Sequence, residues 1–313
     1  MDKSRPIVVT GAAGLIGQNL IPRLKSAGYT RIIGIDKHPA NVKTLARLHP
    51  DVLVIEADLA MPGDWDESFA GAATLVLNHA QIGGIDESPF IANNITATEN
   101  VLAAAKRHGI PHMVHISSSV VNSMARDFYT ESKKAQEQLA VASGIPCSVL
   151  RPTLMFGWFD RKHVGWLARF MKRTPVFPVP GDGRYLRQPL YAGDFCQVIA
   201  ACIANPRPGE NFNITGQSKI DYIDLIKAVR TATGATTRIL HIPYAAFWLL
   251  LKVYAVADRN PPFTTTQLKA LVTPDVFEVI DWPSIFAVTP TSLDCALHET
   301  FQNPSYSSIV LEF

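Results

Sequence analysis

The sequence predicts an α/β fold in which a doubly wound parallel sheet is followed by a smaller, mixed C-terminal lobe. In the first half of the chain, short apolar strands alternate with helices, as in successive βαβ units. These strands are continuously apolar, which is typical of a sheet covered by helices on both faces. After about Arg151 proline becomes frequent and the elements shorten. We therefore expect residues 1–155 to form the sheet domain, with later segments returning to it, and residues 156–313 to form mainly a second lobe.

Six strands are expected in the first half, each a short run rich in Val, Ile and Leu. They are residues 7–10, 31–36, 52–55, 75–77, 113–116 and 147–150.

The first strand follows a polar N-terminal pentapeptide directly, without an apolar leader. We therefore expect a cytoplasmic protein with free thiols.

Four helices are expected between these strands, because apolar residues recur there at three- and four-residue spacing. They are residues 15–27, 42–48, 95–108 and 129–143. Gly28 ends the first, and Gly109 and Pro111 end the third. A later apolar segment, 244–257, is shorter than the ~20 residues of a membrane-spanning helix. It is either a buried helix or one that contacts an apolar substrate or a membrane surface.

The composition describes a chain with enough apolar material for a large core. Of 313 residues, 47% are hydrophobic and 18% charged, and the mean hydropathy is +0.11, which excludes intrinsic disorder. The net charge of +2 gives no overall basic character of the kind that nucleic-acid binding requires. The four cysteines show no C-x-x-C spacing. His112 and His115 are predicted to point to opposite faces of one strand, so we expect no metal.

A glycine-rich loop, Thr-Gly-Ala-Ala-Gly-Leu-Ile-Gly at residues 10–17, joins the first strand to the first helix. Glycines at such a loop allow a tight turn, close approach of the backbone to a pyrophosphate, and close packing of helix on strand. The helix N-terminus offers free N–H groups to the anion. The pattern predicts a Rossmann dinucleotide site. Its residues are Gly11, Gly14, Leu15, Ile16 and Gly17.

Asp36 ends the second predicted strand, where a carboxylate can bind the ribose hydroxyls of the adenosine. A carboxylate repels a 2′-phosphate, which favours NAD over NADP, although Lys37 and His38 weaken that preference. Asp58 and Leu59, after the third strand, are further candidates near the adenine. A helix-capping role for Asp58 is equally consistent with the sequence.

Tyr129 and Lys133 lie four residues apart on one face of a predicted helix. A phenol with an ordinary pKa of ~10 transfers protons poorly at neutral pH, and a nearby ammonium lowers that pKa. The fifth strand, which precedes this helix, ends in three serines, residues 117–119. A serine hydroxyl there can hydrogen-bond a substrate carbonyl or alkoxide while the tyrosine moves the proton.

Together these residues resemble the extended short-chain dehydrogenase/reductase superfamily, which includes NAD-dependent nucleotide-sugar epimerases and dehydratases. The resemblance runs from Ile7 to about Gly216. It also includes residues 94–102, 115–118 and 150–157, and a Gly-Asp-Gly…Arg…Asp block at 181–194.

The resemblance implies roles for individual residues. Ser118, Tyr129 and Lys133 would be catalytic. Ser119, Arg187 and Asn213 would bind substrate, with Arg187 meeting a diphosphate. The further positions implied to surround the cofactor are His79, Ala80, Asn94, Ser117, Tyr129, Lys133, Pro152 and Thr153. At His79, where the family is usually apolar, the imidazole is either a cofactor neighbour or a satisfied core group.

The expected function is therefore an NAD-dependent epimerase or dehydratase acting on a diphosphate-linked sugar, as a homodimer paired through the two long helices. One alternative is net oxidation of a lipid- or sterol-like alcohol or reduction of the corresponding ketone. Two features suggest it: the segment 119–129 is shorter than the corresponding segment of typical sugar epimerases, and residues 244–257 are apolar. Another is a non-catalytic NAD(P)-binding structural subunit. We expect a small-molecule substrate, no nucleic acid and no transmembrane segment, with peripheral membrane contact left open.

Overall fold

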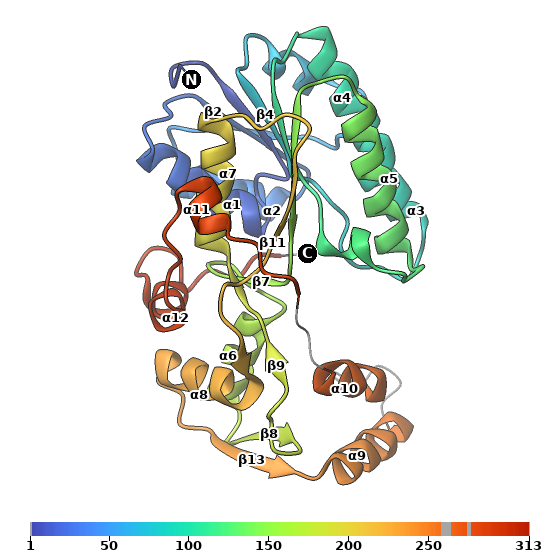
Figure 1. Ribbon diagram of the computed structural model, residues 1–313, viewed down its shortest axis with the longest axis vertical. Helices are drawn as coiled ribbons and strands as arrows, with labels where there is room; N and C mark the ends of the chain where they lie inside the picture. Colours follow the sequence, from blue (N-terminus) through green and yellow to red (C-terminus); the bar gives the residue numbers. More distant parts are fainter. Residues whose placement is uncertain (1, 258–263, 274–276, 313) are drawn as a thin grey trace.

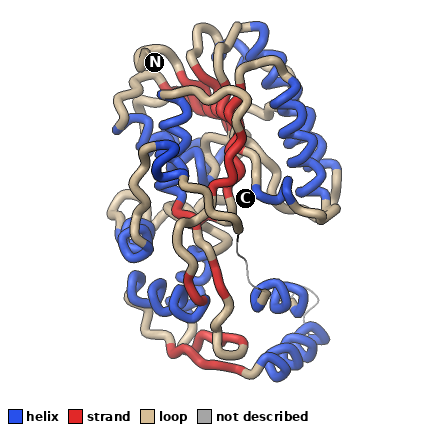
Figure 2. The backbone as a smooth tube through the Cα atoms, viewed as in Figure 1, coloured by secondary structure: helices blue, strands red, loops and turns tan. Residues whose placement is uncertain are grey.

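The computed structural model describes residues 2–257, 264–273 and 277–312. A seven-stranded parallel sheet forms its first domain, which confirms the predicted α/β class (Figures 1 and 2). The strand order is β11-β6-β5-β4-β1-β2-β3, so it reverses between β1 and β4. The strands are β1 (Ile7–Thr10), β2 (Ile32–Asp36), β3 (Leu53–Glu56), β4 (Thr74–Leu77), β5 (Met113–Ile116), β6 (Cys147–Pro152) and β11 (Asn211–Ile214).

Helices cover both faces of the sheet. One face carries α1 (Leu15–Ser26), α2 (Pro39–Leu48), α7 (Ala192–Ala204) and α11 (Trp282–Phe286). The other carries α4 (Ala97–Arg107), α5 (Phe128–Ala142) and the 3-10 helix Asp64–Phe69, with the short helix α3 (Ser88–Phe90) nearby. Every residue of β1, β4 and β5 is buried between these layers, which explains why their sequences are continuously apolar.

The second lobe contains α6, α8 and α12 and several short strands below the sheet domain in Figure 1. Its core includes Val179 of β8 and Ile226 of α8. The helices are α6 (Val164–Arg173), α8 (Tyr222–Thr233), α9 (Tyr244–Ala257), α10 (Thr265–Val272) and α12 (Leu293–Gln302). The strand pairs are β8 (Val176–Pro180) with β13 (Arg238–Ile242), β9 (Leu186–Arg187) with β12 (Ile220–Asp221), and β7 (Met155–Phe156) with β10 (Leu190–Tyr191).

The chain passes between the two lobes repeatedly. It leaves the sheet domain after β6, returns for α7 and β11, leaves again for α8 to α10, and returns once more for α11. After α12 the last residues return to α2, where Asn41 donates to the carbonyl of Glu312 at 2.7 Å and accepts from its N–H at 2.9 Å. Leu311 is buried beside Trp158 and Phe159.

The predicted strands and helices are present, and most of their boundaries lie within two residues of the predicted ones. Helix α2 begins at Pro39 and not at residue 42, because proline is well suited to the first helical position. The first two residues of the predicted helix 95–108 belong to a π-helical segment, Ile91–Thr96, and α4 begins at Ala97. The apolar segment 244–257 forms α9, and none of the described helices is long and apolar enough to cross a bilayer.

Three histidines lie in or beside the sheet, of which His112 and His115 are buried and His79 is half-buried. Burial lowers the pKa of His79 to about 3 and that of His112 to about 4, and it holds the pKa of His115 well below its ordinary value. These imidazoles therefore remain neutral in the folded protein, whereas in the unfolded chain they take up a proton near pH 6.5. Stability is consequently lost as the pH falls below that value.

We predict that His115→Leu, a change to a side chain of similar size, makes stability less sensitive to acid. Between about pH 7.5 and about pH 5.5, one histidine that stays neutral when folded accounts for a loss of about 1.4 kcal/mol in the free energy of unfolding. Denaturant titrations at the two pH values should therefore show an acid-induced loss in the free energy of unfolding that is about 1.4 kcal/mol smaller in the variant than in the wild type. His298→Leu on the exposed surface of α12 is the control and should behave as the wild type does. An unchanged acid loss in His115→Leu would contradict the prediction.

Candidate functional site

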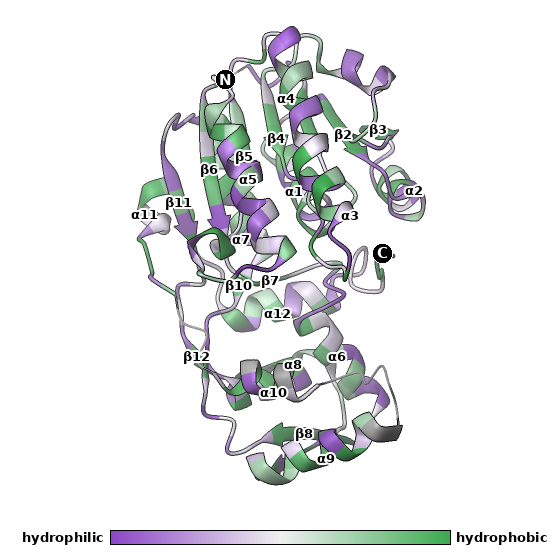
Figure 3. Ribbon diagram, turned by 90° about the vertical axis from the view of Figure 1, so that its right-hand side faces the viewer, coloured by the Kyte–Doolittle hydropathy of each residue, from purple (hydrophilic) through white to green (hydrophobic). Residues whose placement is uncertain are grey.

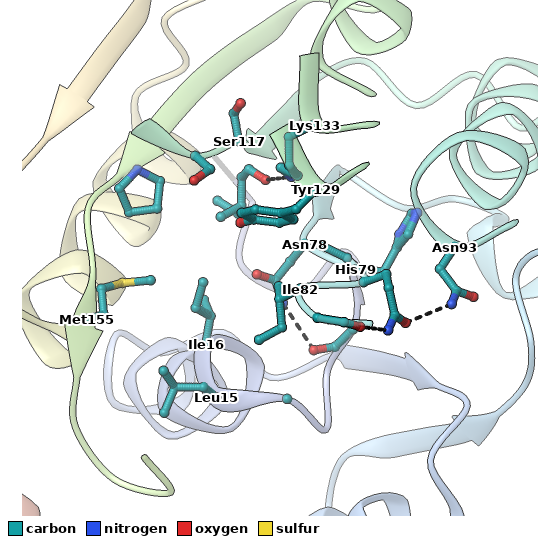
Figure 4. Close-up of a pocket in the computed structure, with 18 of the residues that line it drawn as sticks. Leu15, Ile16, Asn78, His79, Ile82, Asn93, Ser117, Tyr129, Lys133 and Met155 are labelled. Atoms are coloured by element: carbon teal, nitrogen blue, oxygen red, sulfur yellow. Dashed lines mark hydrogen bonds between the residues drawn. The ribbon is translucent and has the colours of Figure 1, made fainter. Parts of the chain in front are cut away.

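A cavity of about 890 Å³ lies at the carboxyl edge of the sheet, beside the point where the strand order reverses. Ligands of open α/β sheets bind at such a switch point. Its walls come from the loops after β1 to β6 and from α5, together with residues of the second lobe. Figure 4 shows Tyr129 and Lys133 on one side of the cavity and Leu15 and Ile16 of α1 on another.

Most of the predicted site residues line this cavity. They are Gly11, Gly14, Leu15, Ile16, Asp36, Lys37, Asp58, Leu59, His79, Ala80, Ser117, Ser118, Ser119, Tyr129, Lys133, Pro152 and Thr153. Gly17, Asn94, Arg187 and Asn213 are not among its walls.

The glycine loop is shaped by two close approaches. Gly11 has a φ of 63°, and a Cβ there would lie 2.8 Å from the Cα of His79. A Cβ on Gly17 would lie 2.3 Å from the carbonyl oxygen of Ala12, so Gly17 acts by packing α1 closely against β1. The first turn of α1 has no side-chain cap, as expected where a ligand phosphate takes the helix N–H groups.

Asp36 is buried at the end of β2 and also shapes the loop. Its carboxylate accepts hydrogen bonds from the backbone N–H of Ala13 and of His38, each at 3.0 Å. The neighbouring cation of Lys37 is already engaged, because its Nζ donates to Asn93 at 2.6 Å and lies 3.7 Å from a carboxylate oxygen of Asp58. A 2′-phosphate would therefore meet two carboxylates and a lysine that one of them already partly neutralises.

Ser118, Tyr129 and Lys133 meet at the other end of the cavity, between β5 and α5. Burial raises the pKa of Tyr129 above its ordinary value, and a hydrogen bond with Ser118 acts in the opposite direction. Lys133 is fully buried, and burial lowers its pKa to about 7. Its Nζ donates to the carbonyl of Ile116 at 3.0 Å and to Oε1 of Gln136 at 2.5 Å, which uses two of its three N–H donors.

A buried chain of hydrogen bonds continues from Lys133 to β1. The amide nitrogen of Gln136 donates to the carbonyl of His79 at 3.1 Å and to Oγ1 of Thr98 at 3.0 Å. The ring nitrogens of His79 lie 3.1 Å from Oγ1 of Thr98 and 2.9 Å from Oγ1 of Thr10. His79 is thus both a wall of the cavity and a hydrogen-bonded core group, and the network ties β1, the loop after β4, α4 and α5 to the ammonium.

Asn94 holds the site together from behind the wall. It lies in the π-helical segment, and its amide donates to Oγ of Ser132 on α5 at 2.9 Å. Its Oδ1 accepts the backbone N–H of Gln81 at 2.6 Å. The far side of α5 is fixed by Glu137, whose carboxylate accepts from Arg151 and from Ser117, the latter at 2.5 Å. Asn94 thus orients α5 and the loop after β4.

The predicted substrate residues of the second lobe lie outside the cavity walls. The guanidinium of Arg187 donates to the carbonyl of Thr273 at 2.9 Å and lies 5.3 Å from the centre of the Tyr185 ring. Asn213, at the end of β11, accepts a hydrogen bond from Asn122 at 3.0 Å. Contact of either residue with a substrate stays a prediction.

Several residues of the site were not predicted. Asn78 and Gln81 line the cavity, and their signal was polarity in a loop where the family is usually apolar. Gln136 has no local signal, since its role depends on which groups face it from other elements. The other unpredicted walls include Asn93, Met155, Lys162, His163 and Phe277.

The cavity fits a dinucleotide cofactor such as NAD on two grounds. Gly11 and Gly14 line the cavity at the start of α1, and the close backbone approaches at Gly11 and Gly17 leave no room for side chains in this loop. In addition, Thr153 and Asn78 of the cavity wall each carry a buried oxygen atom, Oγ1 and Oδ1 respectively, that has no hydrogen-bond partner in the described protein. Buried polar atoms without partners are unfavourable, and the amide and hydroxyl groups of a nicotinamide ribonucleoside can satisfy them.

Comparison with known proteins places these features in a family. Residues 7–215 match the NAD dependent epimerase/dehydratase family. A dTDP-glucose 4,6-dehydratase of Actinoplanes sp. is 27% identical over 263 residues, which cover 73% of this chain and 82% of that protein. An uncharacterized UDP-glucose epimerase of Bacillus subtilis is 26% identical over 267 residues, again 73% and 82% of the two chains.

Solved structures share the fold. The UDP-glucuronic acid 4-epimerase from Bacillus cereus in complex with NAD has a TM-score of 0.71 at 24% identity, over 94% of this chain and 96% of that one. The dTDP-glucose 4,6-dehydratase from Bacillus anthracis in complex with NAD has a TM-score of 0.72 at 20% identity, over 96% of each chain.

We predict that Asp36→Asn weakens NAD binding by about tenfold. A hydrogen bond from a ribose hydroxyl to the charged carboxylate contributes about 1.5 kcal/mol more than a hydrogen bond to the neutral amide that replaces it. The same change removes a charge that repels a 2′-phosphate, so the ratio of NADP to NAD dissociation constants should fall. Calorimetric titration with each cofactor measures both effects. Asp51→Asn, an exposed residue paired with Lys25, is the matched control. Wild-type protein that binds NADP as tightly as NAD would contradict the interpretation.

We predict that two substitutions of Gln136 move the pKa of Lys133 in opposite directions. Gln136→Leu removes an acceptor that stabilises the ammonium and should lower the pKa below about 7. Gln136→Glu adds a carboxylate beside it and should raise the pKa toward the ordinary value of lysine. NMR titration of isotope-labelled lysine checks both, with exposed Gln138→Leu on the same helix as control. Shifts of the same sign in both variants would indicate general disturbance of the core.

Proposed function

The chain belongs to the NAD dependent epimerase/dehydratase family, an enzyme family of the extended short-chain dehydrogenase/reductase type, and we propose that it epimerises a nucleotide-linked sugar. The observation that carries this proposal is the distribution of chemistry along the cavity. Ser118, Tyr129 and Lys133 lie together at one end. The described carboxylates of the wall, Asp36 and Asp58, lie at the other end, after β2 and β3.

This distribution favours epimerisation over dehydration. Eliminating water from a sugar needs an acid for the departing hydroxyl and a base for the neighbouring carbon, in addition to the groups that handle the oxidised oxygen. No carboxylate of the described wall stands beside Tyr129, and the further titratable wall groups on the side of the second lobe are Lys162 and His163. Epimerisation needs no further acid–base pair, since oxidation and re-reduction at one carbon use the same groups.

NAD, when bound, supplies the site that takes a hydride from the sugar carbinol and gives it back. The protein residues manage the oxygen and its proton. Tyr129 accepts the proton of the hydroxyl and later returns it. Ser118 hydrogen-bonds the same oxygen and Tyr129, so both hydroxyls hold it in one position. Lys133, one helical turn further along α5, supplies the positive charge that favours the phenolate.

The residues also suggest how the cofactor is held. Gly11 and Gly14 offer backbone to the pyrophosphate at the start of α1, while Asp36 takes the adenosine ribose and Asp58 and Leu59 border the adenine. At the other end, Pro152 and Thr153 border the nicotinamide. The orphaned hydroxyl of Thr153 supports that part of the assignment.

The two alternative functions have less support. Oxidation of a lipid-like alcohol was suggested by the apolar helix α9, but the described residues of α9 are not part of the cavity wall. A non-catalytic subunit would not need Ser118, Tyr129 and Lys133 to converge on one cavity. As for the partner, resemblance to the family supports a homodimer through α4 and α5, and α5 carries the exposed Val141.

We predict that incubation with UDP- and dTDP-hexoses yields a product of unchanged mass and altered stereochemistry, with no net gain in NADH absorbance. NMR and mass spectrometry of the product, with a spectrophotometric trace, check this. A product lighter by one water identifies a dehydratase, and NADH formed in proportion to product identifies a net oxidoreductase. Either result overturns the proposal, as does the absence of turnover across the panel combined with copurification in a membrane complex.

We predict that Tyr129→Phe lowers kcat by about 10²- to 10⁴-fold, the contribution of a positioned acid–base group, while NAD still binds. Tyr29→Phe is the matched control, because Tyr29 is buried in the core away from the cavity and its hydroxyl has no partner in the described structure. It should leave kcat within about twofold. Undiminished turnover in Tyr129→Phe would exclude the mechanism.

A further inference from the structure

The second lobe carries a strong positive charge that the net charge of the chain conceals. The residues that build it are 160–187, 216–257 and 264–273, which we call the distal lobe. They contain 13 Lys and Arg residues and 4 acidic residues, a net charge of +9. The rest of the described chain contains 15 basic and 21 acidic residues, a net charge of −6. The distal lobe and the rest of the described chain are thus oppositely charged.

Helix α9 lies at the tip of the distal lobe, at the end of the molecule farthest from the sheet (Figures 1 and 3). Its side chains are almost all apolar, yet Leu249, Leu250 and Val253 are 58%, 58% and 63% exposed. An apolar helix in a soluble domain normally buries at least one face. The described residues of α9 between Tyr244 and Ala255 are all exposed or half-buried.

The exposed apolar surface continues onto the neighbouring two-stranded sheet. Side chains alternate along its strands, and Phe177 and Val179 of β8 point into the core of the lobe. Val176 and Leu240 are 40% and 52% exposed, with Arg238 paired opposite Val176. Apolar and basic side chains are therefore mixed on the outer side of this sheet.

We propose that α9 and this sheet dock the protein on an anionic membrane surface. The charge of the distal lobe supplies long-range attraction to acidic headgroups, and the exposed apolar residues supply insertion at the level of the acyl chains. Tyr244 and Trp248 are both 41% exposed, and Nζ of Lys252 lies 5.3 Å from the Trp248 ring. Aromatic rings next to lysine are typical of side chains at a membrane–water boundary.

Charge also favours a bilayer over a second copy of this chain. A two-fold contact through α9 would bring the same surface of two molecules together, and with it two distal lobes of charge +9. Asp182 lies with His241 and Pro243 in a depression beside the start of α9. A flat anionic layer, in contrast, complements the net positive charge of the distal lobe.

Flotation of the full-length protein with vesicles tests the proposal. We expect binding to phosphatidylcholine vesicles that contain roughly one third phosphatidylglycerol, at least about tenfold weaker binding to pure phosphatidylcholine, and release at ~0.5 M salt. The double variant Leu250→Glu/Val253→Glu should bind at least about tenfold more weakly. Met61→Glu changes an equally exposed apolar residue, 62%, on the sheet domain and should bind as the wild type does.

A second variant separates attraction from insertion. Arg238→Gln/Lys252→Gln keeps the apolar surface and should weaken binding to the anionic vesicles by about fivefold for each cation. Bound NAD and circular dichroism establish that each variant is folded. Wild-type protein that fails to float with anionic vesicles, or Met61→Glu that loses binding equally, overturns the proposal. So does a wild-type dimer in light scattering that Leu250→Glu/Val253→Glu converts to a monomer without any vesicle binding, because α9 would then be an interface between copies.

Discussion

A buried ammonium is the constraint on which the architecture of the site depends. Removing an ion from water costs several kcal/mol unless neighbouring groups replace the hydration. Lys133 meets this requirement with the carbonyl at the end of β5 and with the amide oxygen of Gln136. The amide nitrogen of Gln136 then needs acceptors of its own, which His79 and Thr98 provide. Four elements around the cavity thus contribute groups to the network that satisfies one charge.

The same arrangement separates two kinds of chemistry along the cavity. Carboxylates stand after β2 and β3, where they can accept hydrogen bonds from sugar hydroxyls without taking part in proton transfer. Hydroxyl, phenol and ammonium stand between β5 and α5. Because the titratable groups of the reacting end are buried, their pKa values are set by a few hydrogen bonds and by whatever charge a ligand brings. The order of strands in the sheet keeps these two ends of the cavity apart.

Features encoded by neighbouring residues were predictable from the sequence, and features made by distant pairing were not. Strands β1, β4 and β5 are continuous apolar runs because both of their faces are covered, and the glycine loop and Asp36 follow from local geometry. Strand β11, Asn-Phe-Asn-Ile, lies at the edge of the sheet and carries no such run. It exists because it pairs with β6, some sixty positions earlier in the chain. Gln136 was missed for a related reason, since any helix could carry a glutamine. Arg187 was selected by its motif, and the structure engages its guanidinium with Thr273.

The repeated passage of the chain between its two lobes has a consequence for motion. Hinge closure, in which one body swings about a few linking residues, requires few connections. Here α7, β11, α11 and the C-terminal residues all return to the sheet domain, and further links reinforce them: Trp158 donates to the carbonyl of Glu299 at 2.9 Å, and Thr291 is held by Asp194. This connectivity permits small sliding displacements and opposes wide opening. We therefore expect ligand exchange to depend on the loops that border the cavity more than on separation of the two lobes.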